Sequence, residues 1–394
     1  MAGALDGIRI IDLSNVVSGP MAVQILADQG ADVIKVEVPG GGDMARLWGE
    51  VRGGVGAMFA VMNRNKRSIV LNLQEQDGRQ ILCDLVRNAD LLVQNFRPGA
   101  MERLGLGYDA LRTYRDDLIY VSISGYGGDG PYAKRRAYDA MIQTATGYAA
   151  LQAGSKDGVP DLIKNIVCDK VTALTTAQAI TAALLARERG AGGQEVKMSM
   201  LEAGLAFLWP DGMFNNTMLG DGGTPMPPLL TMVRPSKTLN GYVTCAAVTD
   251  TEWQSLTKAL GRPEWGTDPK FAGMMDRFAN WDEIMAWVDQ ELAGQTSDEV
   301  CVLLDQNDVP FAKMNAPENL HLDPQIRHNQ SLVEMEHAHG GKMRMARPPA
   351  RFGETPSSIR YLSPMLGQHT DEILREMGIS GGKIAALRAA GAIG

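Results

Sequence analysis

The sequence predicts an α/β protein, with a large domain built on a parallel sheet and a smaller α+β domain that interrupts it. The first forty residues read as strand 8–13, helix 21–29 and strand 32–37, and two strands joined through a helix run parallel. The chain has 394 residues, more than one hydrophobic core usually serves. A segment rich in glycine and proline at 219–236 then separates two regions of different pattern.

The alternation of strands and helices continues to about residue 200. We predict helix 77–88, strands 91–94 and 118–124, a long helix 169–189, strand 195–200 and a helix from 201. After the glycine-rich segment come strand 242–248 and helices 251–260, 281–292 and 297–306, then an irregular, β-like stretch from about 325 and helices 370–377 and 382–390. The expected domains are a large one at 1–200 and 330–394, a linker at 201–224, and a small one with its return linker at 225–329.

Composition narrows the class of protein. A net charge of −8 argues against nucleic acid as the main partner, which needs a broad basic surface. No apolar run approaches the roughly 18 residues that span a bilayer, and the N-terminus lacks the apolar core of a signal peptide. Four scattered cysteines suit a reducing cytoplasm, and neither they nor the five histidines, all after residue 320, show metal-ligand spacing. We therefore expect no metal.

Nucleotide-binding motifs are incomplete. The turn at 14–20 holds one glycine where a dinucleotide fingerprint needs three, and the glycines at 40–42 and 53–56 lack the Lys-Ser/Thr ending of a P-loop. Two groups of cations, Arg97 with Arg103 and the run 134–136, could instead bind phosphates through their side chains. A solvated basic face explains the run equally well, so the residues alone leave both interpretations open.

Asp169 stands, with Lys170, before an uncharged run that extends to Ala186. Aspartate is a preferred N-cap residue and is stabilised by the helix dipole. A carboxylate at the mouth of an apolar helix can also serve as a nucleophile. This segment alone does not decide between the two roles.

Several segments resemble one known family in order along the chain. They are 5–13, 30–37, 65–73, Asn95-Phe-Arg-Pro-Gly99 followed by Glu102-Arg-Leu-Gly105, the turn 125–132, and Leu366-Gly-Gln-His-Thr-Asp-Glu-Ile-Leu374. This set is similar to the class III CoA-transferases, a family that includes formyl-CoA transferases, carnitine CoA-transferases and α-methylacyl-CoA racemases.

The resemblance implies a Rossmann-like large domain in an interlocked, ring-like homodimer, with coenzyme A or acyl-CoA and a small carboxylic acid as substrates. It places the catalytic aspartate on Asp169, which would form an acyl anhydride and then an aspartyl-CoA thioester. An ionised aspartate needs no histidine to activate it, in agreement with the absence of histidine before residue 321. The implied CoA-binding residues are Val16, Val17, Ser18, Leu71, Asn72, Leu73, Gln74, Asn95, Phe96, Arg97, Arg103, Arg135, Arg136 and Tyr138.

Two other functions compete with CoA transfer. Family racemases carry a His-Asp pair where this chain has Tyr138-Asp139, and a phenol with a pKa near 10 is a poor base at neutral pH. The second competing function is that of a non-catalytic CoA-binding protein. The chain also departs from formyl-CoA transferase, which has glutamine at the position of Val17, arginine at that of Val38 and a run of four glycines that this chain lacks. The sequence therefore leaves the acyl donor undecided among succinyl-CoA, formyl-CoA and another short acyl-CoA.

Overall fold

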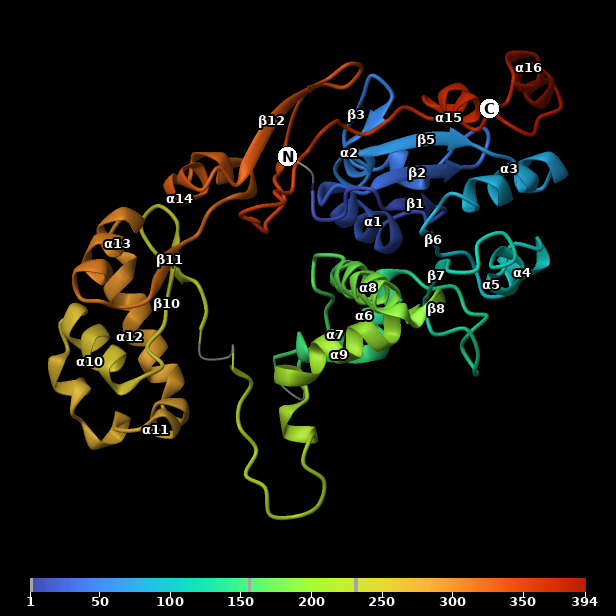
Figure 1. Ribbon diagram of the computed structural model, residues 1–394. Helices are drawn as coiled ribbons and strands as arrows, with labels where there is room; N and C mark the ends of the chain where they lie inside the picture. The colour runs from blue at the N-terminus through green and yellow to red at the C-terminus, as the bar shows by residue number, and fades with distance from the viewer. Residues whose placement is uncertain (1–2, 155–156, 230–232) are drawn as a thin grey trace. The chain divides into compact units, whose positions relative to one another are not determined.

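The computed structural model describes residues 3–154, 157–229 and 233–394, and the chain divides into two compact units (Figure 1). Unit 1 comprises residues 1–208 and 329–394, and unit 2 comprises residues 209–328. The sequence predicts a linker at 201–224, but residues 201–208 belong to helix α9 (Met200–Gly212) and to unit 1. The smaller unit is thus an insertion into the larger one.

A six-stranded parallel sheet forms the centre of unit 1. Its order is β5 (Lys66–Val70), β2 (Asp32–Glu37), β1 (Arg9–Asp12), β6 (Leu91–Gln94), β7 (Ile119–Ser124) and β8 (Gln194–Ser199). The chain proceeds from β1 towards one edge and later, from β6, towards the other. The point between β1 and β6 is where ligands bind in sheets of this kind. The parallel α/β fold predicted from the sequence is confirmed, and the unpredicted β5 is an additional edge strand.

Helices cover both faces of the sheet, because successive strand residues point to opposite sides. On one face, Ile10 and Val33 pack with Leu26 of α1 (Ser18–Asp28) and Ile180 of α8 (Val167–Ala186). On the other face, Ile11 and its neighbours pack against α3 (Gln76–Val86), α15 (Thr370–Glu376) and α16 (Gly381–Ala389). The C-terminal helices therefore belong to the core of unit 1.

Shorter elements complete unit 1. They are η1 (Met44–Leu47), β3 (Val51–Arg52), β4 (Val55–Gly56), α2 (Ala57–Met62), α4 (Ala100–Arg103), α5 (Tyr108–Leu111), α6 (Asp139–Thr146), α7 (Tyr148–Leu151), η2 (Arg187–Ala191), β12 (Leu332–His337) and β13 (Gly341–Ala346). The last two pair as an antiparallel hairpin, where the sequence predicts an irregular, β-like stretch.

Unit 2 is a small α+β unit with its own core. Its elements are η3 (Phe214–Asn216), β9 (Ser236–Lys237), β10 (Tyr242–Cys245), α10 (Asp250–Ala259), η5 (Pro263–Gly266), η6 (Pro269–Phe271), α11 (Met274–Ala279), α12 (Trp281–Ala293), α13 (Ser297–Gln306), β11 (Phe311–Lys313), η7 (Pro317–Leu322) and α14 (Pro324–His328). Trp253, Phe271 and Trp287 pack at its centre. The predicted glycine-rich linker lies partly in residues 230–232, outside the described chain. Within the described residues, no helix has the length and apolar character needed to cross a membrane.

Candidate active site

Asp169 lies in the first turn of α8 rather than at its cap, which is Ile166. Its backbone N–H donates to Asp139 Oδ1 at 2.9 Å, so a carboxylate on α6 caps this helix from outside. The capping interpretation of Asp169 is therefore wrong. Asp139 thus accepts one N–H of the first turn of α8, and the Asp169 side chain lines a cleft.

The amino end of α1 lies in the same cleft as Asp169. Ser18, the first residue of α1, lines the same cleft as Asp169, and its hydroxyl and backbone N–H lower the pKa of the Asp169 carboxyl group. Gly19 permits this placement, since a Cβ on it would lie 2.2 Å from Cβ of Ser14. Pro20 is tolerated because the first helical turn needs no N–H there. Two helix amino ends, which carry partial positive charge, thus converge on one carboxylate.

The pKa of Asp169 is raised from its usual 3.8 to about 6. Burial is the largest cause and the negative charge of Asp139 acts in the same direction, while the hydroxyl and backbone N–H of Ser18 lower the pKa. The carboxyl group is then ionised at pH 7 by about ten to one. It combines the charge that a nucleophile needs with an environment poor in water.

Asp169 lines a cleft of about 280 Å³ at the switch point of the sheet. The walls come from the loops that follow β1, β6 and β7, all at the carboxyl ends of parallel strands. The lining residues are Asn15, Val16, Ser18, Asn95, Phe96, Arg97, Pro98, Ile123, Ser124, Gly125, Ala133, Arg135, Arg136, Ala137, Tyr138, Asp169 and Met200.

Three arginines give the cleft its charge. Arg97, Arg135 and Arg136 line it and are exposed, and the Arg135 guanidinium stacks on the Tyr132 ring at 3.7 Å. In the described part of the chain none of the three forms an ion pair with an acidic side chain. Cations held in a cleft without acidic partners suit an anionic ligand such as a phosphate.

The structure brings together most of the predicted site residues but not all of them. Val16, Ser18, Asn95, Phe96, Arg97, Arg135, Arg136, Tyr138 and Asp169 share the cleft. Val17 does not line it and packs instead with Ala45, Phe59 and Met62.

The predicted contacts at 71–74 and at Arg103 also lie outside the cleft lining. Leu71 is fully buried and Leu73 nearly so, both in the core of unit 1. Asn72 bonds to the C-terminal segment through Ala392, and Gln74 is exposed. Arg103 is also exposed and lies close to Gly99. A role for these residues in CoA binding stays a prediction.

Sequence reasoning missed two positions of the site. Asp139 was noted only beside Tyr138, yet it is buried and bonds to both Asp169 and Gln143. Asn15 exchanges two hydrogen bonds of 2.8 Å with Asn95, which joins the loops after β1 and β6. An acid in the first turn of α6 was the available signal for Asp139. For Asn15 the sequence holds no comparable signal.

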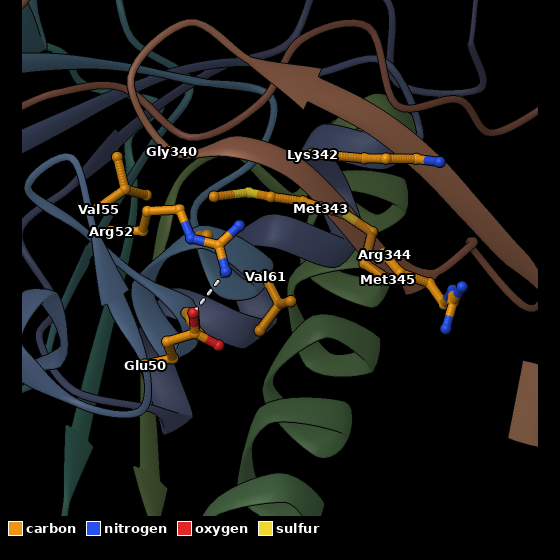
Figure 2. A pocket seen from close by; sticks show the side chains of 11 residues that line it. Glu50, Arg52, Val55, Val61, Gly340, Lys342, Met343, Arg344 and Met345 are labelled. Carbon is orange, nitrogen blue, oxygen red and sulfur yellow. Dashed lines mark hydrogen bonds and ion pairs between the residues drawn. The ribbon is translucent and has the colours of Figure 1, made fainter. Parts of the chain in front are cut away.

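A second pocket, of about 210 Å³, lies between β3, β4 and the β12–β13 hairpin (Figure 2). Its one acidic side chain, Glu50, is paired with Arg52. No buried carboxylate comparable to Asp169 lines it. Among the described residues, no three His, Cys, Asp or Glu side chains gather as metal ligands in either pocket or elsewhere.

The fold and the cleft define a class: an α/β protein with a cationic cleft at the switch point of a parallel sheet and a partly buried carboxylate within it. Comparison with known proteins makes the assignment specific. Residues 5–370 match the model of CoA-transferase family III, and the chain belongs to that family.

Individual relatives extend over almost the whole chain. An acyl-CoA transferase of Fusarium pseudograminearum is 37% identical over 99% of this chain and 88% of its own length. A formyl-CoA:oxalate CoA-transferase of Escherichia coli is 33% identical over 98% and 99%, respectively. The crystal structure of a CAIB/BAIF family protein from Brucella suis matches with a TM-score of 0.83, 30% identity, and coverage of 96% of this chain and 100% of that one. The predicted family and its enzymatic nature are confirmed.

Proposed function

We propose that this enzyme transfers CoA from a short acyl-CoA to a carboxylic acid, with Asp169 as the covalent nucleophile. The observation that carries the proposal is the Asp169 carboxylate in a cleft with three arginines, none of which forms an ion pair with an acidic side chain in the described residues. The arginines would bind the phosphates of CoA, and the carboxylate would meet the thioester. Formyl-CoA and succinyl-CoA are the proposed donors.

The proposed reaction has four steps. The Asp169 carboxylate attacks the thioester carbonyl, which forms an acyl-aspartyl anhydride and releases CoA thiolate. The thiolate attacks the aspartyl carbonyl and releases the donor acid, leaving an aspartyl-CoA thioester. The acceptor carboxylate attacks this thioester and expels the thiolate again. The thiolate then attacks the acceptor carbonyl of the new anhydride, which yields the product acyl-CoA and restores the Asp169 carboxylate.

The pH dependence of the first step follows from the pKa of Asp169. Since the ionised form is the nucleophile, the rate of anhydride formation should rise with pH through about 6. Burial raises this pKa most and the negative charge of Asp139 raises it further, so Asp139→Asn should move the midpoint to lower pH. Stopped-flow measurement of thiol release across pH 4–8 gives the midpoint for the wild-type enzyme and for Asp139→Asn. Asp161→Asn, at an exposed acid paired with Lys164, is the control and should leave the midpoint in place. An unchanged midpoint in Asp139→Asn would contradict this account.

Phosphate binding by the arginines has a separate test. Arg135→Gln should raise the KM for acyl-CoA about tenfold, the effect of one lost charged hydrogen bond, while turnover at saturation changes little. Lys134→Gln removes the same charge from a neighbour that does not line the cleft and should have little effect on KM. Equal effects of the two substitutions would show that general charge, rather than a contact to phosphate, is responsible.

The racemase alternative finds little support at this site. Tyr138 takes the place of the racemase histidine and its side chain is 57% exposed. No histidine is among the residues that line the cleft.

We further propose that the protein forms the interlocked homodimer implied by the family resemblance, which light scattering would test. We also propose a cytoplasmic location.

A further inference from the structure

Val16 has a backbone conformation that few β-branched residues adopt. Its φ angle is 73°, in the left-handed region, which a β-branched side chain rarely enters. Such a conformation persists only where the surroundings determine it fully, and it tends to occur at functional sites. Val16 lies in the cleft, two residues before Ser18.

Three side chains from separate segments hold the loop that contains Val16. Lys35 Nζ donates to the carbonyl of Ser14 at 2.7 Å. The amide of Asn95 binds both backbone groups of Asn15 at 2.8 Å. The N–H of Val16 donates to Asp43 Oδ1 at 3.0 Å. Every one of these side chains comes from a different part of the chain, so the loop has little freedom to relax.

Asp43 is the contact that acts on the strained residue itself. Its Oδ1 also accepts the N–H of Ala45 at 2.9 Å, and its Oδ2 lies 3.1 Å from Lys35 Nζ. Both side chains of this ion pair are fully buried. Buried charges of this kind are held in one geometry by their partners. Asp43 therefore presents a fixed acceptor to Val16.

We propose that Asp43, oriented by Lys35, is a positioning residue: it holds Val16 in the left-handed conformation and so directs the donors of Ser18 at Asp169. The inference rests on the proposed function. In the second step of that reaction, thiolate attack places negative charge on the Asp169 carbonyl oxygen. Donors aimed at that atom in advance stabilise the charge as it develops. With a negative φ at Val16, the chain would enter α1 in a different direction.

Three substitutions separate the position of Val16 from the charge of Asp43. Asp43→Ala removes the acceptor, whereas Asp43→Asn keeps an oxygen for Val16 and removes only the charge. Val16→Pro leaves Asp43 intact but forces φ to about −65° and removes the N–H. This third variant keeps the buried ion pair, so it tests the proposal even if Asp43→Ala does not fold.

The measured quantity is the rate of aspartyl-CoA thioester formation at Asp169, followed by mass spectrometry in single turnovers across pH. Asp43→Ala and Val16→Pro should slow it about 100-fold, the effect of one lost oxyanion donor, and Asp43→Asn should recover part of the rate. The pH midpoint should rise in the two slow variants, because the hydroxyl and backbone N–H of Ser18 lower the pKa of Asp169. The other charged or titratable groups near Asp169 are unchanged: Asp139, Cys168, Tyr138, Arg97, Arg135 and Arg136.

Asp28→Asn is the matched control. Asp28 forms a buried ion pair with Arg64 at 2.7 Å near the opposite end of α1. The Asp28→Asn substitution should lower the melting temperature of the protein without moving the pH midpoint of thioester formation. If Val16→Pro and Asp43→Ala form the thioester at the wild-type rate with an unchanged midpoint, the positioning role is overturned while the proposed function stands. If the wild-type enzyme forms no adduct at Asp169 with any acyl-CoA, the proposed function fails and the inference fails with it.

Discussion

Asp169→Ala should abolish the covalent adduct and reduce CoA transfer by at least about 10³-fold, since loss of a covalent nucleophile removes the route through the aspartyl intermediates. The adduct is detected by trapping with hydroxylamine or borohydride after incubation with a panel of acyl-CoAs. Transfer is followed by exchange of labelled carboxylate into acyl-CoA. Binding of CoA should persist, because the arginines that line the cleft remain in place.

Asp129→Asn is a suitable control for this experiment. Asp129 is an exposed acid in the turn before Arg135 and is not among the residues that line the cleft. It should retain full transfer. An Asp169→Ala enzyme with full activity would contradict the proposed mechanism. Release of α-proton label into water without CoA exchange would instead favour the racemase, and CoA binding by a wild-type protein with no turnover would favour a non-catalytic role.

Asp12→Ala should cause the largest loss of stability, about 3–5 kcal/mol in the free energy of unfolding. Asp12 lies 2.8 Å from Lys66 and 4.0 Å from Lys35, and all three side chains are fully buried. Burial lowers the pKa of Lys66 to about 8, against the opposing effect of Asp12. Removal of the carboxylate leaves two buried ammonium groups with less compensating charge. Urea unfolding monitored by circular dichroism measures the loss.

A double variant separates the charge from the packing. Asp12→Asn with Lys66→Met should recover part of the stability lost in Asp12→Ala, because a neutral side chain removes the uncompensated buried charge. Asp84→Asn is the control, since the pair of Asp84 with Arg87 is exposed and should contribute less than about 1 kcal/mol. The account is wrong if Asp12→Ala costs no more than this control.

The two predictions concern one structural unit. Lys35 contacts Asp43, and through Asp43 it helps to hold the loop before α1. Lys66 also donates to the carbonyl of Pro20 at 2.9 Å, within the first turn of α1. We therefore expect these buried charges to support both the stability of unit 1 and the placement of Ser18. A loss of stability and a loss of activity are expected to accompany one another at these positions.

Much of the fold could be predicted from the sequence. The period-two and helical patterns identified β1, β2, β6, β7 and β8 with small errors at their ends, because hydrophobic periodicity is a local property. The strand β5 was not predicted. Its first two residues have partners far along the chain, Asp12 for Lys66 and Asp32, Glu372 and Glu376 for Arg67, and a local pattern does not show such partners.

The sequence by itself determined the family, the parallel sheet and the segments that follow β1, β6 and β7, because ordered motifs and local periodicity are both visible in one dimension. Tertiary structure decided the roles within the site. It placed Asp169 inside the first turn of α8 with its N–H donating to Asp139, and it placed Val17 in the core. It also brought Asp43 to Val16. These outcomes depend on burial and on pairing between residues tens of positions apart, and neither is a property of any local stretch of sequence.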